Sequence, residues 1–335
     1  NDPDLVIIKS MSTTYEWVVG DSVRGSDKSW FLSTKDDEET GQSDIMSFGK
    51  QKISVGTNNR VNNNSNSFLV YSWAAGGSKN SFNIDGIGYA SAADCGMDGG
   101  SITPTGCSVS TKNGFSIVKW TGTGANGSIS HGLGQTPDFI MTHNLPSDGT
   151  TDTLVWNSGY NDANPATIAS IPYDTKFWTG ETTTFNNTSP TSSVFSLGNS
   201  VETNRSGGSF IAYCWSEVPG FSKFGSYTGN GSSSGTYVDL GFRPAFLILR
   251  RTDDSKSWIL FDNKRSPSNL VNKSLYPNRN DGDNGLSNLE VDFLSTGFKL
   301  RNSVSTINAS GGTYVYMAFA EEPGTTPFDT FTNAR

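Results

Sequence analysis

The apolar positions of this chain form short runs that recur three times in the same order. Each series begins with a run that starts at a proline, and it ends with an aromatic run. The first members are residues 3–9 (PDLVIIK), 137–143 (PDFIMTH) and 244–250 (PAFLILR), and the closing members are residues 68–73 (FLVYSW), 210–215 (FIAYCW) and 314–319 (YVYMAF). An internal repeat of roughly a hundred residues predicts tandem domains.

The segments between these runs predict further strands joined by polar turns. Short apolar runs bounded by Gly, Asn and Ser are typical of β-strands. The third unit opens with residues 220–231 (GFSKFGSYTGNG), and the second unit opens with residues 114–124 (GFSIVKWTGTG). An asparagine suited to a turn precedes each closing run, at Asn62, Asn204 and Asn308. Each complete unit therefore has an opening strand, a proline strand with its hairpin partner, and a closing strand.

The first unit lacks the opening strand, because nothing of this kind precedes Pro3. A sheet edge with unpaired backbone groups invites pairing with another strand. We therefore expect upstream sequence or a neighbouring chain to supply the missing strand. The chain does not start with Met, which favours an upstream part that is processed or lies outside this sequence.

These patterns predict an all-β protein of tandem antiparallel β-sandwich repeats, of the jelly-roll or lectin-like kind. Residues 1–77 form an incomplete first unit, and residues 78–112 form a linker or insertion. The second unit spans residues 113–219, and the third spans residues 220–335.

The proline and closing strands are apolar on both faces, unlike strands that have one face in water. Leu5 through Ile8 form an unbroken apolar run, as do Tyr314 through Phe319. The second face must be covered by an adjacent unit or by another subunit. We therefore expect homo-oligomerisation, with a trimer as one form.

Composition narrows the classes of partner. The formal net charge is −8, whereas a phosphate-backbone partner requires a basic stripe, so no nucleic acid is expected. No apolar run approaches the roughly 20 residues that cross a bilayer, so we expect neither a signal peptide nor membrane insertion. The 37 glycines and the aromatic content of 12% are typical of short strands, tight turns and a buried core.

The candidate catalytic groups favour a protein that is not an enzyme. Acidic clusters occur at residues 36–39, 253–254 and 281–283, all in polar loop sequence where solvated carboxylates are the ordinary case. His131 and His143 have no nucleophile motif beside them. No catalytic residue and no cofactor is therefore expected.

The sequence contains one segment that resembles a metal-binding loop and three cysteines. Residues 278–290 (NRNDGDNGLSNLE) resemble a calcium loop, but Glu290 falls one position short of the bidentate ligand, so a plain loop or a looser surface site remains. No metal site is assigned. Cys95 and Cys107 lie in one Gly-rich segment and are a possible disulfide, whereas Cys214 lies in an apolar strand.

Glycan binding requires an exposed aromatic surface beside polar side chains. Trp156, Tyr160 and Trp178 are the candidates, because Trp156 and Tyr160 flank a strand end that is followed by a polar loop. The alternative is that Trp156 packs against a neighbouring unit. The pairs Asp21/Arg24 and Asp262/Arg265 repeat at the hairpins and are interpreted as scaffold.

Several segments resemble repeats in virion proteins of marine bacteriophages, particularly the cyanophage type. The matching strings are GFSKFGSYTGNG, GFRPAFLILRRTDDSKSWILFDNKR, FLSTGFKLRNS, NASGGTYVYMAFAE, SISHGLGQTPDFIMTHN and the insertion AAGGSKNSFNIDGIGYA. His143 departs from the pattern by replacing a basic residue, and Cys95 and Cys107 stand where such insertions carry small residues.

The resemblance implies an extracellular location on the virion surface, with other virion proteins as partners. We expect a non-enzymatic structural protein of the tail fibre or appendage type, which attaches to a host-surface glycan or builds the particle. The alternatives are a capsid decoration protein and a carbohydrate-active enzyme with lectin-like modules.

Overall fold

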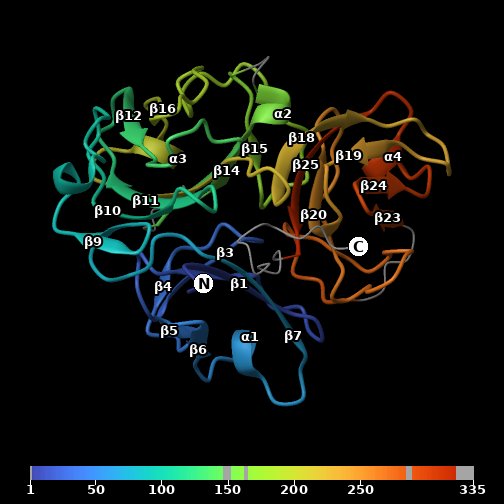
Figure 1. Ribbon diagram of the computed structural model, residues 1–335, viewed down its shortest axis with the longest axis horizontal. Coiled ribbons are helices and arrows are strands. Elements are labelled where there is room, and N and C mark those ends of the chain that lie inside the picture. The colour runs from blue at the N-terminus through green and yellow to red at the C-terminus, as the bar shows by residue number, and fades with distance from the viewer. Residues whose placement is uncertain (1, 146–151, 162–164, 284–288, 322–335) are drawn as a thin grey trace, which may run out of the picture.

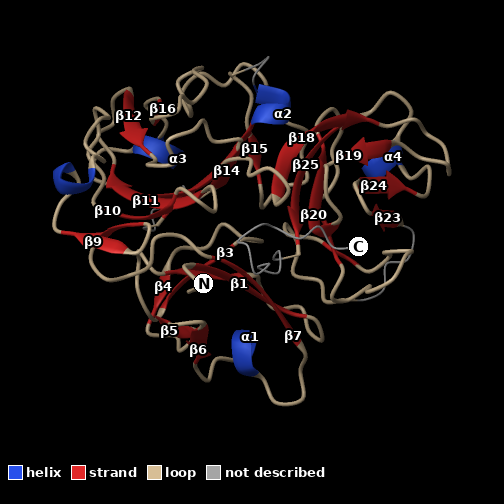
Figure 2. Cartoon of the chain, viewed as in Figure 1, coloured by secondary structure: helices blue, strands red, loops and turns tan. Residues whose placement is uncertain are grey.

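Three β-sheet units surround a common centre (Figure 1). The computed structural model describes residues 2–145, 152–161, 165–283 and 289–321. Its helices are single short turns, and nearly all regular structure is strand (Figure 2). The all-β sandwich class predicted from the sequence is confirmed. The described residues contain no helix that is both long and apolar enough to cross a membrane.

The first unit is a five-stranded sheet in the order β4-β3-β2-β1-β7, with a small hairpin, β5–β6, beside it. The proline strand β1 pairs antiparallel with both β2 and the closing strand β7. The elements are β1 (Leu5–Ser10), β2 (Val18–Asp21), β3 (Lys28–Phe31), β4 (Glu39–Thr40), β5 (Ile45–Gly49), β6 (Lys52–Val55), α1 (Asn59–Asn62) and β7 (Phe68–Trp73).

The second unit is an eight-stranded sheet in the order β15-β14-β13-β17-β11-β10-β8-β9, covered by the pair β12–β16. Residues 78–112, predicted as a linker or insertion, add β8, β9 and β10 to this sheet beyond the opening strand β11. The elements are β8 (Phe82–Ile84), β9 (Ile87–Tyr89), η1 (Ala93–Cys95), β10 (Gly106–Ser110), β11 (Phe115–Thr121), β12 (Gly127–Ser130), β13 (Phe139–Asn144), β14 (Thr153–Asn157), α2 (Ser158–Asn161), β15 (Ala169–Ser170), β16 (Val194–Leu197), α3 (Val201–Asn204) and β17 (Ser209–Trp215).

The third unit has a five-stranded sheet, β18-β25-β20-β21-β22, and a three-stranded sheet, β19-β24-β23. Its opening strand β18 pairs with the closing strand β25, as β11 pairs with β17 in the second unit. The elements are β18 (Ser222–Thr228), β19 (Tyr237–Asp239), β20 (Pro244–Arg251), β21 (Ile259–Asp262), β22 (Ser274–Leu275), β23 (Val291–Leu294), β24 (Gly297–Leu300), α4 (Ser305–Asn308) and β25 (Thr313–Ala320).

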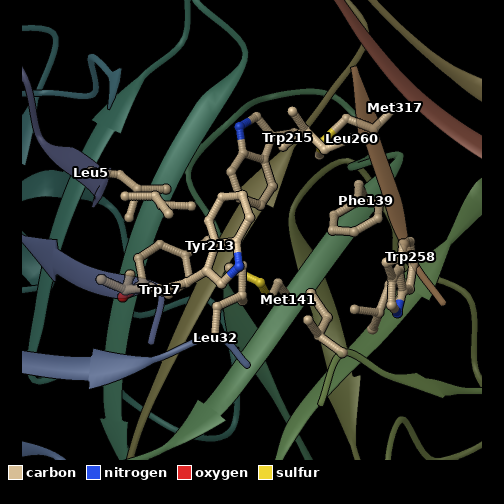
Figure 3. Packing of buried hydrophobic residues seen from close by; sticks show 14 of the residues in the cluster. Leu5, Trp17, Leu32, Phe139, Met141, Tyr213, Trp215, Trp258, Leu260 and Met317 are labelled. Atoms are coloured by element: carbon tan, nitrogen blue, oxygen red, sulfur yellow. The ribbon is translucent and has the colours of Figure 1, made fainter. Parts of the chain in front are cut away.

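The inner faces of the three main sheets share one central core. Figure 3 shows side chains from all three units converging there, including Leu5, Tyr213 and Leu260. The half-buried Trp73 packs against this core, with its ring centroid 5.9 Å from that of Trp215 and 5.8 Å from that of Phe319, its equivalents in the other two closing strands. Aromatic pairs at such edge-on distances add about 1 kcal/mol each beyond the area that they bury.

The outer face of each main sheet has a separate core. The first, second and third units contribute clusters around Phe31, Trp120 and Phe298, respectively. Both faces of the proline strands are therefore covered within one chain. The sequence predicted that either an adjacent unit or another subunit covers the second face of these strands. The adjacent units supply this cover, so the argument for a homo-oligomer from uncovered strand faces no longer applies.

Candidate functional site

The units meet at three seams, where the closing strand of one unit lies against the hairpin end of the next, and buried polar side chains bind across two of these seams. At the seam between the second and first units, the Tyr213 hydroxyl donates to Asp21 Oδ2 at 2.7 Å. Arg24 Nε donates to the same oxygen at 2.5 Å. Both partners are buried, so the carboxylate is held by donors from two units.

The seam between the first and third units repeats this arrangement. The Tyr71 hydroxyl donates to Asp262 Oδ2 at 3.0 Å, and Arg265 Nε donates to it at 2.6 Å. The aspartate–arginine pairs interpreted as hairpin scaffold thus also join units. Because the tyrosines come from distant strands, the sequence repeat alone did not reveal these contacts.

The seam between the third and second units is apolar at the same positions. Met317 occupies the place of the two tyrosines, and Asn157 occupies the place of the aspartates. The Asn157 side-chain amide has no hydrogen-bond partner within the described residues. Close backbone contact replaces the polar bonds, because a Cβ on Gly159 would clash with the backbone of Gly225.

A second set of basic residues links the units at the ends of the proline strands. Lys9 Nζ donates to the carbonyl of Asn280 in the third unit at 2.9 Å. Arg250 Nη1 donates to the carbonyl of Tyr173 in the second unit at 2.9 Å. Burial lowers the pKa of Lys9 to about 8 and that of Arg250 to about 10. These cations bind main-chain oxygens across seams, which is a structural task.

His143 occupies the equivalent place in the second unit and acts as a neutral ring. It stacks on Trp30 of the first unit with centroids 3.9 Å apart, and its Nδ1 lies 2.9 Å from Thr153 Oγ1. Burial, reinforced by the nearby Arg24 charge, holds the His143 pKa well below its usual value. A stacked, uncharged ring explains why a basic residue is replaced here.

The other histidine, His131, is also buried. Its Nε2 donates to the carbonyl of Thr191 at 3.1 Å, and its Nδ1 accepts the Leu133 N–H at 3.3 Å. Burial lowers its pKa to about 4. Both ring nitrogens are engaged by the backbone, so this side chain fixes a loop.

The calcium-like segment serves as a brace between the third and first units. The Asn280 carbonyl accepts from Lys9, and its Oδ1 accepts from Ser33 Oγ at 2.5 Å. Arg279 pairs with Asp281 at 2.5 Å. Residues 284–288 of this segment lie outside the described residues. No group of three or more His, Cys, Asp or Glu side chains suited to a metal ion occurs in the described part of the chain.

The three aromatic residues predicted for glycan binding do not form an exposed surface. Trp156 is 0% exposed and belongs to the outer core of its own unit, which corrects both the glycan prediction and the expected packing against a neighbouring unit. Tyr160 packs against the central core with its ring 5.5 Å from Phe177. Trp178 packs against the same outer core as Trp156, with its ring 6.0 Å from Tyr173.

The possible Cys95–Cys107 disulfide is absent, because all three cysteines are free thiols. Cys95 Sγ donates to the carbonyls of Ser91 and Ala92 at 3.4 and 3.3 Å. Burial raises the pKa of Cys107 to about 12, so this thiol stays protonated. Cys214 is buried in β17, as predicted for a small apolar residue.

An exposed aromatic that the sequence reasoning missed is Tyr237 on β19. This residue is 44% exposed, and its hydroxyl lies 2.7 Å from Thr296 Oγ1 and 3.2 Å from Asp239 Oδ1. Residues 237–240 alternate between exposed and buried positions, with Val238 and Leu240 in the core. That alternation was the available signal for a strand with one outward aromatic face.

Comparison with known proteins gives one match. No curated protein and no solved structure matches this chain. The model of a family described as a domain of unknown function, DUF7483, matches residues 1–323. The chain therefore belongs to the DUF7483 family.

Proposed function

We propose that this chain is a non-enzymatic structural protein on the surface of a phage particle, of the tail fibre or appendage type, which builds the particle or attaches it to a host. One observation carries the proposal: the three units close into a ring whose buried polar groups bind one another across the seams. Lys9, Arg250 and Asp21 are used to hold the units together. Groups in such fixed, desolvated contacts suit a rigid building block.

The virion location rests on the resemblance of the repeat strings to marine phage virion proteins. A closed ring of three similar units also suits a place on a threefold axis of a fibre or a capsid, because its outline repeats about the ring centre. A fibre protein and a capsid decoration protein both fit this shape. Reconstruction of an intact particle discriminates between them by where the chain is found, and absence from the particle would contradict both.

The attachment role has Tyr237 as its best-placed group. An exposed ring with a hydroxyl partner and a carboxylate nearby can pack on a sugar face and hydrogen-bond its hydroxyls. We predict that Tyr237→Ala abolishes binding on an array of host-surface glycans, whereas Tyr237→Phe keeps most of it. Because the side chain is exposed, the melting temperature should stay unchanged in both variants. Equal binding by Tyr237→Ala and the unaltered protein would remove this site, and no binding at all would favour pure architecture.

The enzyme alternative has a direct test. Incubation with host polysaccharide should release no new reducing ends. Their appearance would favour a carbohydrate-active enzyme over the structural role.

A further inference from the structure

The closing strand of the first unit is the edge of its sheet within the described residues. In the other two units this place beside the closing strand is filled by an opening strand, β11 or β18. Val70 on β7 is 49% exposed, whereas its equivalents Ala212 and Tyr316 are 0% and 5% exposed. The first unit therefore leaves uncovered a surface that the other two bury.

The central core shows the same difference on the inner side of β7. Leu69, Tyr71 and Trp73 are only half-buried. Their equivalents are buried in both other units, as Ile211, Tyr213 and Trp215 on β17 and as Val315, Met317 and Phe319 on β25. The inward side chains of opening strands, such as Ile117 and Phe224, complete this cover in the second and third units.

The outward backbone groups of β7 are those of alternate residues. The Trp73 carbonyl accepts from Asp4 N at 2.8 Å, so Trp73, Tyr71 and Leu69 direct their backbone groups toward β1. The two-residue period then directs the groups of Phe68, Val70 and Ser72 to the open edge. They offer N–H and C=O partners for one further antiparallel strand.

The turn before β7 has the hydrogen-bonding side chain that binds the end of such a strand in the other units. In the complete units, an asparagine side chain binds the turn through Nδ2 and accepts a backbone N–H from the opening segment through Oδ1. Asn204 Oδ1 accepts from Thr123 N, and Asn308 Oδ1 accepts from Asn230 N, both at 2.9 Å. Asn62 Nδ2 donates to Gly56 O at 2.8 Å, as Asn204 Nδ2 does to Gly198 O at 2.8 Å. No described residue donates to Asn62 Oδ1.

The backbone of this turn is also conserved in shape between the units. Ser65 has φ 66°, close to the values of 74° for Gly207 and 72° for Gly311. A serine in this region is uncommon. In the other units these glycines donate to the carbonyls of Gly122 and Gly229, respectively, both at 2.9 Å. Ser65 presents the same donor, and no carbonyl among the described residues accepts it.

We propose that β7 and the turn at residues 62–66 form a docking site for an extended strand donated by another polypeptide chain. The strand is of the opening type, with alternating apolar residues that end in an aromatic residue followed by Thr-Gly-x-Gly, as in WTGTG and YTGNG. Both strands of this type in the described chain, β11 and β18, are already paired. Addition of a strand to an exposed edge uses the main chain for affinity and side-chain pockets for specificity.

The first position of the Thr-Gly-x-Gly signature requires glycine, because there is no room for a Cβ atom. A Cβ on Gly122 would clash with the Arg205 carbonyl oxygen, and one on Gly229 would clash with that of Ala309. The equivalent carbonyl in the first unit belongs to Asn63, which accepts Asn66 N at 3.2 Å as Ala309 O accepts Gly312 N at 3.1 Å. An incoming strand must therefore carry glycine at this point.

A synthetic peptide of residues 220–231 tests the site. We expect one peptide to bind per chain, measured by titration calorimetry, with its Ser222 opposite Trp73 and its Thr228 opposite Ser67, by analogy with the pairing of β18 and β25. Val70→Pro in the protein removes an outward N–H and should abolish binding, while the β1–β7 hydrogen bonds remain. Val70→Thr keeps the N–H and should bind as the unaltered protein does.

A second variant changes only the peptide, so it leaves the fold of the protein unaltered. The peptide with Gly229→Ala should bind roughly tenfold or more weakly, because its methyl group meets the Asn63 carbonyl. No binding of the parent peptide, or equal binding by either altered partner, overturns the proposal. Self-association of the protein through β7 that excludes the peptide would also overturn it, in favour of a second copy as the occupant. These outcomes are independent of the glycan and particle experiments.

Discussion

Single residues at repeated positions show how one scaffold tolerates different chemistry. Asp4 Oδ2 accepts Ala75 N at 2.7 Å, and Asp138 Oδ2 accepts Glu217 N at 2.8 Å, so each carboxylate fixes the exit of its closing strand. The third unit has Ala245 there, and Glu321, which follows its closing strand, accepts from Asn263 Nδ2 at 2.8 Å. The repeated Pro-Asp pair was visible in the sequence, but the substitute contact was not.

The two buried histidines make folding sensitive to acid, because burial lowers the pKa of each. The His131 pKa is about 4 in the folded chain and about 6.5 in the unfolded chain. The unfolded state therefore binds the extra proton first, so stability is full above pH 6.5 and falls as the pH is lowered toward 4.

We predict that His131→Gln removes the contribution of this histidine to the pH dependence, which is on the order of 3 kcal/mol of unfolding free energy between pH 6.5 and 4. Urea unfolding at a series of pH values measures it. The overall stability of the variant is not the readout, since any loss that is constant with pH leaves the slope unaffected. An unchanged slope would contradict a neutral, buried His131.

At the scale of elements, the seams explain why three similar sheets assemble in one order. Two seams join a tyrosine to an aspartate–arginine pair, and the third packs α2 against β18 and β25, with Gly159 close to the backbone of Gly225. The polar and apolar seams are not interchangeable, because a buried carboxylate without its donors carries a large desolvation cost. This difference favours the correct neighbour for each unit.

Tyr213→Phe tests this role. Loss of the hydroxyl leaves Asp21 buried with one donor fewer, and we predict a decrease of roughly 1–3 kcal/mol in the free energy of unfolding. Met317→Leu is the matched control at the apolar seam, with an expected cost below about 1.5 kcal/mol. Chemical denaturation of both variants measures the difference. Equal losses would show that the hydroxyl contact does not strengthen its seam.

At the scale of the whole molecule, the shared central core makes the three units one folding body. Each main sheet buries its inner face only against the other two sheets. Removal of one unit therefore exposes the inner faces of the remaining two. Independent tandem sandwiches would each bury their own faces and unfold separately.

We predict a single calorimetric transition, with calorimetric and van't Hoff enthalpies that agree. A fragment of residues 220–321 should fail to fold, because Phe224, Phe246 and Phe319 lose their cover. Two or more transitions, or a folded fragment with a cooperative melt, would contradict this dependence between units.

The amino-acid pattern was enough to predict the proline strands, their hairpin partners, the opening and closing strands and the turns before the closing strands. These are local or repeated features. A proline, an asparagine at a turn or an apolar run predicts the same element in each of the three units. The pattern also determined that both faces of the proline strands need cover, since Leu5 through Ile8 leave no polar face.

Which surface covers each face, and which polar groups meet, became visible only in the folded molecule. The contact of Tyr71 with Asp262 joins residues far apart in the chain, and Trp156 is buried although its strand end looked exposed. Such pairings depend on how whole sheets pack, and packing is a property of three-dimensional shape that no local pattern of residues contains.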